Sequence, residues 1–139
     1  MRQAQKRISV DCRGRGLYEV TRQVDGWVRE SGIETGLLTV FTPHTSCSLI
    51  IQENADPDVL HDLETFFAHI APDGDPSHRH RMEGTDDMPA HIRATLTGAS
   101  LNIPVAKGRM VLGAWQGLYL YEHRHRTMRR QLILHLAGD

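Results

Sequence analysis

Three histidines are candidate metal ligands: His44, His80 and His91. Of these, His44 and His91 stand at positions where the chain is expected to be rigid. His44 follows Pro43 at the end of an apolar run, and His91 follows Pro89 at the predicted start of a helix. Imidazoles from separate chain segments are typical of open catalytic zinc sites, in which three protein ligands leave one position for water or substrate. We therefore predict that these three histidines hold a divalent metal, which needs rigidly presented ligands.

The alternative is that the histidines are ordinary surface residues. The chain has nine of them, so some lie near one another by chance, and their spacing matches neither a zinc finger nor an HExxH helix. Asp86 and Asp87 lie in the acidic turn between His80 and His91. They either orient a ligating histidine or cap the helix that carries His91. Both interpretations stay open.

Other polar side chains are candidates for catalysis. Glu53 and Asn54 follow a predicted buried strand, where they either line a cleft or form a local turn. Gln116 lies in the string GAWQG, whose two glycines indicate a close approach of backbone beside Trp115. We predict Trp115 as a core residue and Gln116 as a substrate contact. Glu53 is the predicted proton-transfer group at the metal, with Asp87 as the alternative.

A dense basic segment, HRHRTMRR, covers residues 123–130. Guanidinium groups bind phosphate oxygens in a fixed bidentate geometry, so this segment is a candidate phosphate site. The alternative is a strand edge that is protected from pairing by its charges.

Composition restricts the class of protein. A chain of 139 residues fits one domain, 1–139, with a real hydrophobic core. A net charge of −1 argues against binding to nucleic acid or to a membrane surface. The N-terminal residues lack the apolar stretch of a signal peptide. Cys12 and Cys47 are expected to be buried thiols, and the protein is expected to be cytoplasmic.

The hydrophobic pattern predicts alternating short strands and amphipathic helices. The helices are predicted to begin with caps at Thr21 and Asp56, and a third is predicted to begin at Pro89. The predicted helices end near Gly32, Ile70 and Gly98. This arrangement indicates an α+β domain, a mostly antiparallel, sandwich-like sheet with two or three packed helices. The predicted strands are 5–12, 36–42, 46–52, 100–105, 109–112, 115–121 and 131–136.

Three long motifs, HTSCSLIIQENADPDV, EGTDDMPAHIRATLTG and GRMVLGAWQGLYLYEHR, resemble the YjbQ-like family, which is named for a secondary thiamine-phosphate synthase activity. The resemblance runs from about Ser9 to Gly138. It implies an antiparallel α+β sandwich, a homotrimer and a metal-binding histidine set at His44, His80 and His91. One departure lies after the Trp-Gln strand, where many members have EFDGPR and this chain has EHRHRT.

The resemblance also implies a reaction: hydroxymethylpyrimidine pyrophosphate is joined to a thiazole phosphate and pyrophosphate is expelled. Such chemistry needs positioned reactants and neutralisation of the departing anion. Asn54, Arg129 and Arg130 are the implied substrate-binding residues. Magnesium, the usual ion of pyrophosphate chemistry, prefers oxygen ligands, whereas three imidazoles suit zinc. Three hypotheses follow: a weak thiamine-phosphate synthase, a zinc-type hydrolase or lyase, and a non-catalytic metal- or ligand-binding trimer.

Overall fold

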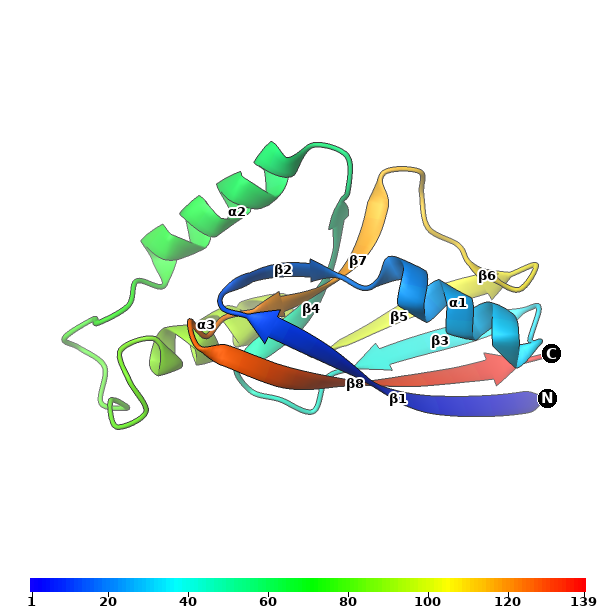
Figure 1. Cartoon of the computed structure of the whole chain (residues 1–139), viewed down its shortest axis with the longest axis horizontal. Coiled ribbons are helices and arrows are strands. Elements are labelled where there is room, and N and C mark those ends of the chain that lie inside the picture. Colours follow the sequence, from blue (N-terminus) through cyan, green and yellow to red (C-terminus); the bar gives the residue numbers. More distant parts are fainter.

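The computed structural model describes residues 1–139 as two antiparallel sheets and three helices (Figure 1). The predicted α+β class with mostly antiparallel strands is confirmed. The five-stranded sheet has the order β1 (Arg2–Arg13), β8 (Thr127–Gly138), β3 (Gly36–Phe41), β5 (Ser100–Ala106), β6 (Arg109–Met110). The three-stranded sheet has the order β2 (Gly16–Glu19), β7 (Gln116–Glu122), β4 (Cys47–Glu53). The helices are α1 (Thr21–Ser31), α2 (Pro57–Ile70) and α3 (Asp87–Thr97).

The core lies between the two sheets. Strand β8 pairs with both β1 and β3, so it runs through the middle of the larger sheet. Because side chains alternate along a strand, Leu132, Leu134 and Leu136 all point inward and are fully buried. Leu118 and Leu120 meet them from β7. Helix α1 adds its buried valines to the same cluster of eighteen buried residues.

Helix α2 lies on the opposite side of the small sheet from the core, set apart from the body of the molecule (Figure 1). It contacts that sheet through Phe67, whose ring is edge-on to Tyr121 at 5.7 Å. Asp56 caps the helix as predicted, since its Oδ1 accepts a hydrogen bond from the Asp58 N–H at 2.9 Å. Helix α3 follows α2 through a loop of residues 71–86 and packs beside β4, where the Leu49 N–H donates to the Gly98 carbonyl.

One local prediction was wrong, and one strand was not predicted. Thr21 does not cap α1, because the helix already includes it and Val20 stands at the cap position. The Thr21 hydroxyl donates to Glu19 and accepts the Leu118 N–H at 2.9 Å, so it ties the helix to β7 instead. The short strand β2 was not predicted, since four residues are too few to show a period.

A buried ion pair joins the two sheets. Glu122, at the end of β7, is 0% exposed and Arg130, on β8, is 2% exposed. The Arg130 Nε and Nη2 donate to the two carboxylate oxygens of Glu122, each at 2.6 Å. Nη2 also donates to the Ser46 hydroxyl at 2.8 Å. One Glu122 oxygen accepts the N–H groups of His123 and Arg124 as well. Burial opposes ionisation of Arg130, but the bonds to Glu122 raise its pKa above the ordinary value.

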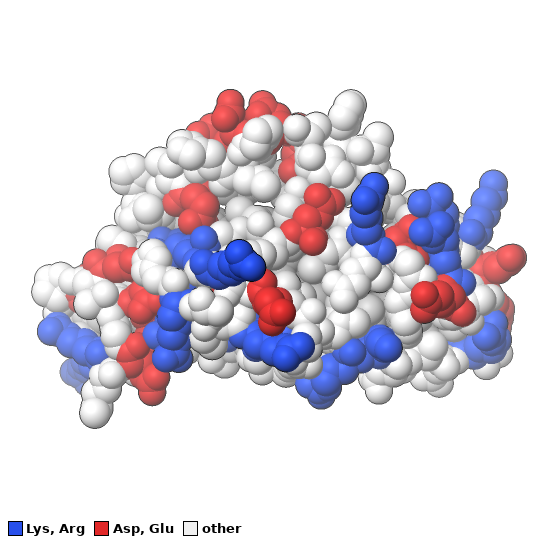
Figure 2. Space-filling model, viewed as in Figure 1, with Lys and Arg blue, Asp and Glu red and all other residues white.

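The surface carries both signs of charge. On the face drawn in Figure 2, acidic side chains gather over α2 and basic side chains run along the opposite edge. No helix of the structure has both the length and the apolar composition that crossing a bilayer requires.

We predict that Arg130→Met lowers the free energy of unfolding by about 3–5 kcal/mol, because it leaves Glu122 buried without its partner. Urea unfolding measures the change. The double variant Glu122→Leu/Arg130→Met should recover only part of it, since two backbone N–H groups then lose their acceptor. Arg129→Met is the matched control, because the Arg129 side chain is 71% exposed, and its effect should stay below about 1 kcal/mol. Equal losses in the two single variants would contradict the prediction.

Candidate metal centre

His80, Asp87 and His91 converge at the beginning of α3. Their ligand atoms lie within 4.8 Å of one another. The Oδ2 of Asp87 is 2.6 Å from the Nε2 of His80 and 3.2 Å from the Nε2 of His91. Asp87 and His91 are four residues apart on α3, so they share one face of the helix. His80 reaches the same point from the loop before the helix. This set of three could hold a divalent ion.

The tautomer of the neutral His91 imidazole is set by its surroundings. Its Nδ1 lies 2.7 Å from the carbonyl oxygen of Thr45. A carbonyl oxygen only accepts, so Nδ1 carries the proton and a neutral His91 has its lone pair on Nε2. Metal-ligating histidines are commonly oriented by such a bond from their other ring nitrogen.

This lone pair is directed at a carboxylate oxygen, and two acceptors at 3.2 Å repel each other. The contact becomes favourable when a proton or a cation lies between them. The side chains of His80, Asp87 and His91 are therefore placed to hold a proton or a cation between them. Burial alone would raise the pKa of Asp87, but the hydrogen bond from His80 and the charge of Arg124 hold that pKa below its usual value. The Asp87 carboxylate is ionised at neutral pH.

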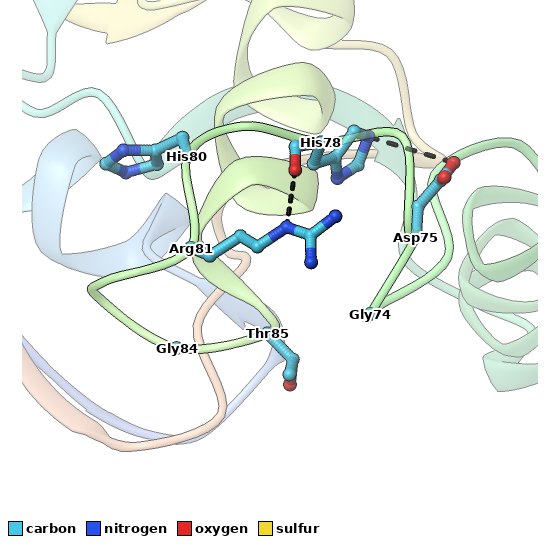
Figure 3. Close-up of a pocket in the computed structure, with 7 residues that line it drawn as sticks. All are labelled: Gly74, Asp75, His78, His80, Arg81, Gly84 and Thr85. Carbon is cyan, nitrogen blue, oxygen red and sulfur yellow. Dashed lines mark hydrogen bonds and ion pairs between the residues drawn. The ribbon is translucent and has the colours of Figure 1, made fainter.

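The loop that carries His80 encloses a cavity of about 120 Å³ with no hydrophobic lining residue. Figure 3 shows Arg81 pointing into the loop, where its Nε donates to the His78 carbonyl at 2.6 Å. The same guanidinium also donates to the carbonyl of Pro76. The imidazole of His80 points away from this interior in Figure 3, and its side chain is 44% exposed. Arg81 thus holds the loop in shape, while His80 faces outward to the metal group.

His44 is not part of this group within the chain. Its Nε2 accepts the backbone N–H of Gln131 on β8 at 3.0 Å, so the lone pair that a metal would need is already engaged. Burial lowers the pKa of His44, and the Arg130 charge lowers it further, so the imidazole is neutral at neutral pH. His44 and His91 line the same open cavity of about 340 Å³. The prediction that His44 is a metal ligand stays a prediction.

The interpretation that one of the two aspartates caps α3 through its side chain was wrong. Asp86 stands at the cap position of α3, but neither side chain makes a capping bond. One oxygen of Asp86 accepts instead from Arg124 Nε and from the His125 N–H. Asp87 belongs to the candidate ligand set itself, rather than acting only as a proton-transfer group.

Glu53, Asn54 and Gln116 meet at the other end of the small sheet. Glu53 pairs with Gln116 across β4 and β7, and the Asn54 amide lies 3.4 Å from the Gln116 carbonyl. Cys47 begins β4 beside the His44 cavity, and Glu53 lies six residues further on, which is about 20 Å at the usual rise of about 3.3 Å per residue. Within one chain, Glu53 and Gln116 therefore cannot serve the metal group. Trp115 is 67% exposed, so the predicted core role was wrong.

The basic segment does not form one phosphate site. Arg130 points inward to Glu122, whereas Arg129, its neighbour on the strand, points outward and lies 3.5 Å from Asp11. Adjacent residues of a strand face opposite sides, so these two cannot bind one ligand together. Arg124 is also buried and engaged with carboxylates. The sequence pattern did not predict these contacts of Arg124. Asp87 was not predicted as a ligand either, although the four-residue spacing to His91 was a usable signal.

Comparison with known proteins finds relatives along almost the whole chain. The family model described as UPF0047 protein YjbQ-like matches residues 6–139. A UPF0047 protein of Synechocystis is 50% identical over 138 residues, which cover 99% of this chain and 94% of that protein. The UPF0047 protein YjbQ of Escherichia coli O157:H7 is 40% identical over 136 residues, which cover 97% of this chain and 98% of that protein.

Solved structures show the same fold. The crystal structure of a conserved hypothetical protein from Thermus thermophilus has a TM-score of 0.84 and 36% identity, covering 93% of this chain and 97% of that one. A YbjQ-like protein of unknown function from Sulfolobus solfataricus has a TM-score of 0.86 over 99% of this chain and 100% of that one. Its identity of 23% supports a likeness of fold alone.

We predict that the purified protein loses its divalent ion when His80 or His91 is replaced by alanine, or Asp87 by asparagine, because each change removes one donor of the group. His44→Ala distinguishes the two ligand sets: the ion should be retained if His80, Asp87 and His91 hold it within one chain, and it should be lost if the predicted three-histidine set holds it. Elemental analysis after dialysis measures the metal content. Loss of the ion from His44→Ala together with full retention in Asp87→Asn would favour the three-histidine set instead.

Proposed function

The chain belongs to the UPF0047 protein YjbQ-like family, and on that premise we propose that it is a metal-dependent enzyme acting on a phosphorylated or pyrophosphorylated small molecule. The observation that carries the proposal is the carboxylate oxygen of Asp87 that faces the Nε2 atoms of both His80 and His91. The reaction we propose is a weak thiamine-phosphate synthase activity, in which hydroxymethylpyrimidine pyrophosphate is joined to a thiazole phosphate and pyrophosphate leaves.

The donor set favours zinc or a similar transition metal. Two imidazoles and one carboxylate are a common ligand set of catalytic zinc, whereas magnesium prefers oxygen ligands and retains waters. A bound divalent ion supplies positive charge that polarises a substrate oxygen or acidifies a water. The side chains of His80 and His91 are 44% and 29% exposed, so a substrate can approach the group from solvent.

The neighbouring side chains have distinct roles in this proposal. The Thr45 carbonyl fixes the tautomer of His91. His44 shares the open cavity with His91; because its Nε2 is an acceptor, its Nδ1 holds the proton and can donate to a substrate oxygen. Glu53 and Asn54 belong to the cluster at the far end of β4, so they take part only where a second subunit brings them to the group.

A zinc-type hydrolase or lyase of another substrate is the second candidate. The same two histidines and carboxylate favour it, because this ligand set is typical of zinc enzymes rather than of magnesium-dependent pyrophosphate chemistry. A non-catalytic metal-binding trimer is the third candidate. The open approach to His80 and His91 argues for an enzyme, since a purely structural ion is usually enclosed by four protein ligands.

We predict that thiamine phosphate forms from the two precursors only when the metal is bound. Chelation should abolish turnover, and added zinc should restore it. Loss of a residue that only supports a metal ligand typically lowers activity about 10- to 100-fold. Asp87→Ala and His91→Ala remove ligands themselves, so each should lower kcat/KM by more than that. His61→Ala is the matched control, because this histidine of α2 has a side chain that is 76% exposed and pairs only with Asp62.

Three outcomes would contradict the synthase proposal. Turnover that survives both ligand variants would exclude the metal mechanism. Metal-dependent hydrolysis of other phosphate esters without thiamine phosphate formation would favour the second candidate. Binding of metal without turnover of any phosphate ester or pyrophosphate would favour the third.

We also propose that the protein is a cytoplasmic homotrimer. Cys12 and Cys47 are buried free thiols, as expected in a reducing compartment. The outer face of the large sheet carries an apolar row, in which Leu37 of β3 lies between Ala137 and Pro104 of the neighbouring strands. Leu37 is 48% exposed and Phe41, on the same face, is 41% exposed. A second copy of the chain would remove these side chains from water; the number three comes from the family resemblance.

We predict three times the chain mass of 15.7 kDa by light scattering after gel filtration. The double variant Leu37→Asp/Phe41→Asp should shift the protein toward monomer, because buried charges without partners oppose association. A monomer mass for the unmodified protein at micromolar concentration would contradict the proposal.

A further inference from the structure

A buried arginine stands directly behind the candidate metal group. Arg124 lies in the connection between β7 and β8, and its side chain is 6% exposed. Its guanidinium reaches across to the start of α3. There the Nη1 donates to Asp87 Oδ1 at 2.6 Å, and the Nε donates to Asp86 Oδ2 at 3.1 Å. The Nη2 donates to the Glu83 carbonyl at 2.8 Å. Three acceptors hold the planar group in one orientation.

The two oxygens of Asp87 are thereby divided between different partners. Oδ1 is engaged by Arg124, and Oδ2 faces the imidazoles of His80 and His91. Rotation of the carboxylate would break a charge-assisted bond of 2.6 Å inside the protein, and such bonds are strong. The carboxylate therefore presents a single oxygen to whatever lies between the imidazoles.

The same contact sets the charge of the group. Asp86 and Asp87 are adjacent carboxylates, and neither makes a capping bond to α3. Arg124 is the buried cation that contacts both of them. Without it, two neighbouring negative charges would repel each other, and Asp87 would turn toward solvent. With Arg124 in place, Asp87 keeps its Oδ2 oxygen available for an ion, and the arginine charge compensates much of the negative charge of the carboxylate.

From these contacts we propose that Arg124 is a positioning residue of the metal centre. It restricts Asp87 to binding the ion through Oδ2 alone, and it offsets the aspartate charge so that the bound ion remains electrophilic. This inference rests on the proposed metal centre at His80, Asp87 and His91. Arg124, in the basic segment after β7, would then position a metal ligand instead of binding a phosphate.

The test compares metal binding by the full-length wild-type chain and by Arg124→Gln. We expect Arg124→Gln to bind Zn²⁺ about 10- to 100-fold more weakly, which is the usual effect of losing a residue that orients a ligand. We also expect the visible absorption spectrum of the Co²⁺-loaded variant to change, because Asp87 can then rotate and offer both oxygens. Arg126→Gln is the matched control. It removes the same charge from an exposed position of the same connection, and it should alter neither the affinity nor the spectrum.

A second variant keeps the test decisive if Arg124→Gln does not fold. Arg124→Lys keeps the charge, but one ammonium group cannot reproduce the planar fork, so we expect an intermediate affinity with an altered Co²⁺ spectrum. Unchanged affinity and spectrum in a folded Arg124 variant would overturn the inference while leaving the metal centre intact. Failure of the wild-type chain to bind Zn²⁺ or Co²⁺ would instead overturn the metal centre, and with it the proposed function.

Discussion

The ion pair between Glu122 and Arg130 is the contact on which the arrangement of the site depends. It lies between the two sheets, with both side chains almost fully buried. Two buried charges are costly to dehydrate, so the pair is tolerated only because its geometry is bidentate and Glu122 also accepts two backbone N–H groups. Those two N–H groups belong to His123 and Arg124. The pair therefore fixes the start of the connection after β7 as well as joining the sheets.

A second set of buried charges joins that connection to the candidate metal group. Arg124, just after β7, donates hydrogen bonds to Asp86 and Asp87 at the start of α3. Asp87 in turn contacts the two histidines. His91 is held from the other side by the carbonyl of Thr45. Asp87 and His91 are thus supported by buried charge and by backbone, whereas the third member of the group, His80, is provided by the exposed loop before α3.

The molecule separates its polar side chains into two distant clusters. One contains His80, Asp87 and His91 beside the beginning of β4, and the other contains Glu53 and Gln116 at its end. A strand is straight enough that a residue at one end cannot reach a ligand at the other. A catalytic role for the second cluster at the metal would therefore require a neighbouring subunit, which the exposed apolar side chains Leu37 and Phe41 make chemically reasonable.

The sequence by itself determined the features that depend on neighbouring residues. The Asp56–Pro57 start of α2, a strand over residues 131–136 and the helix that carries His91 follow from local signals, and the structure confirms them. Long-range contacts were decided only by the tertiary structure. His44 meets the N–H of Gln131 87 residues away, and Arg124 meets Asp87 37 residues away. The pattern of residue types does not encode which segments pack together. It could name His80 and His91 and place Asp87 near a ligating histidine, but it did not show that one oxygen of Asp87 faces both imidazoles.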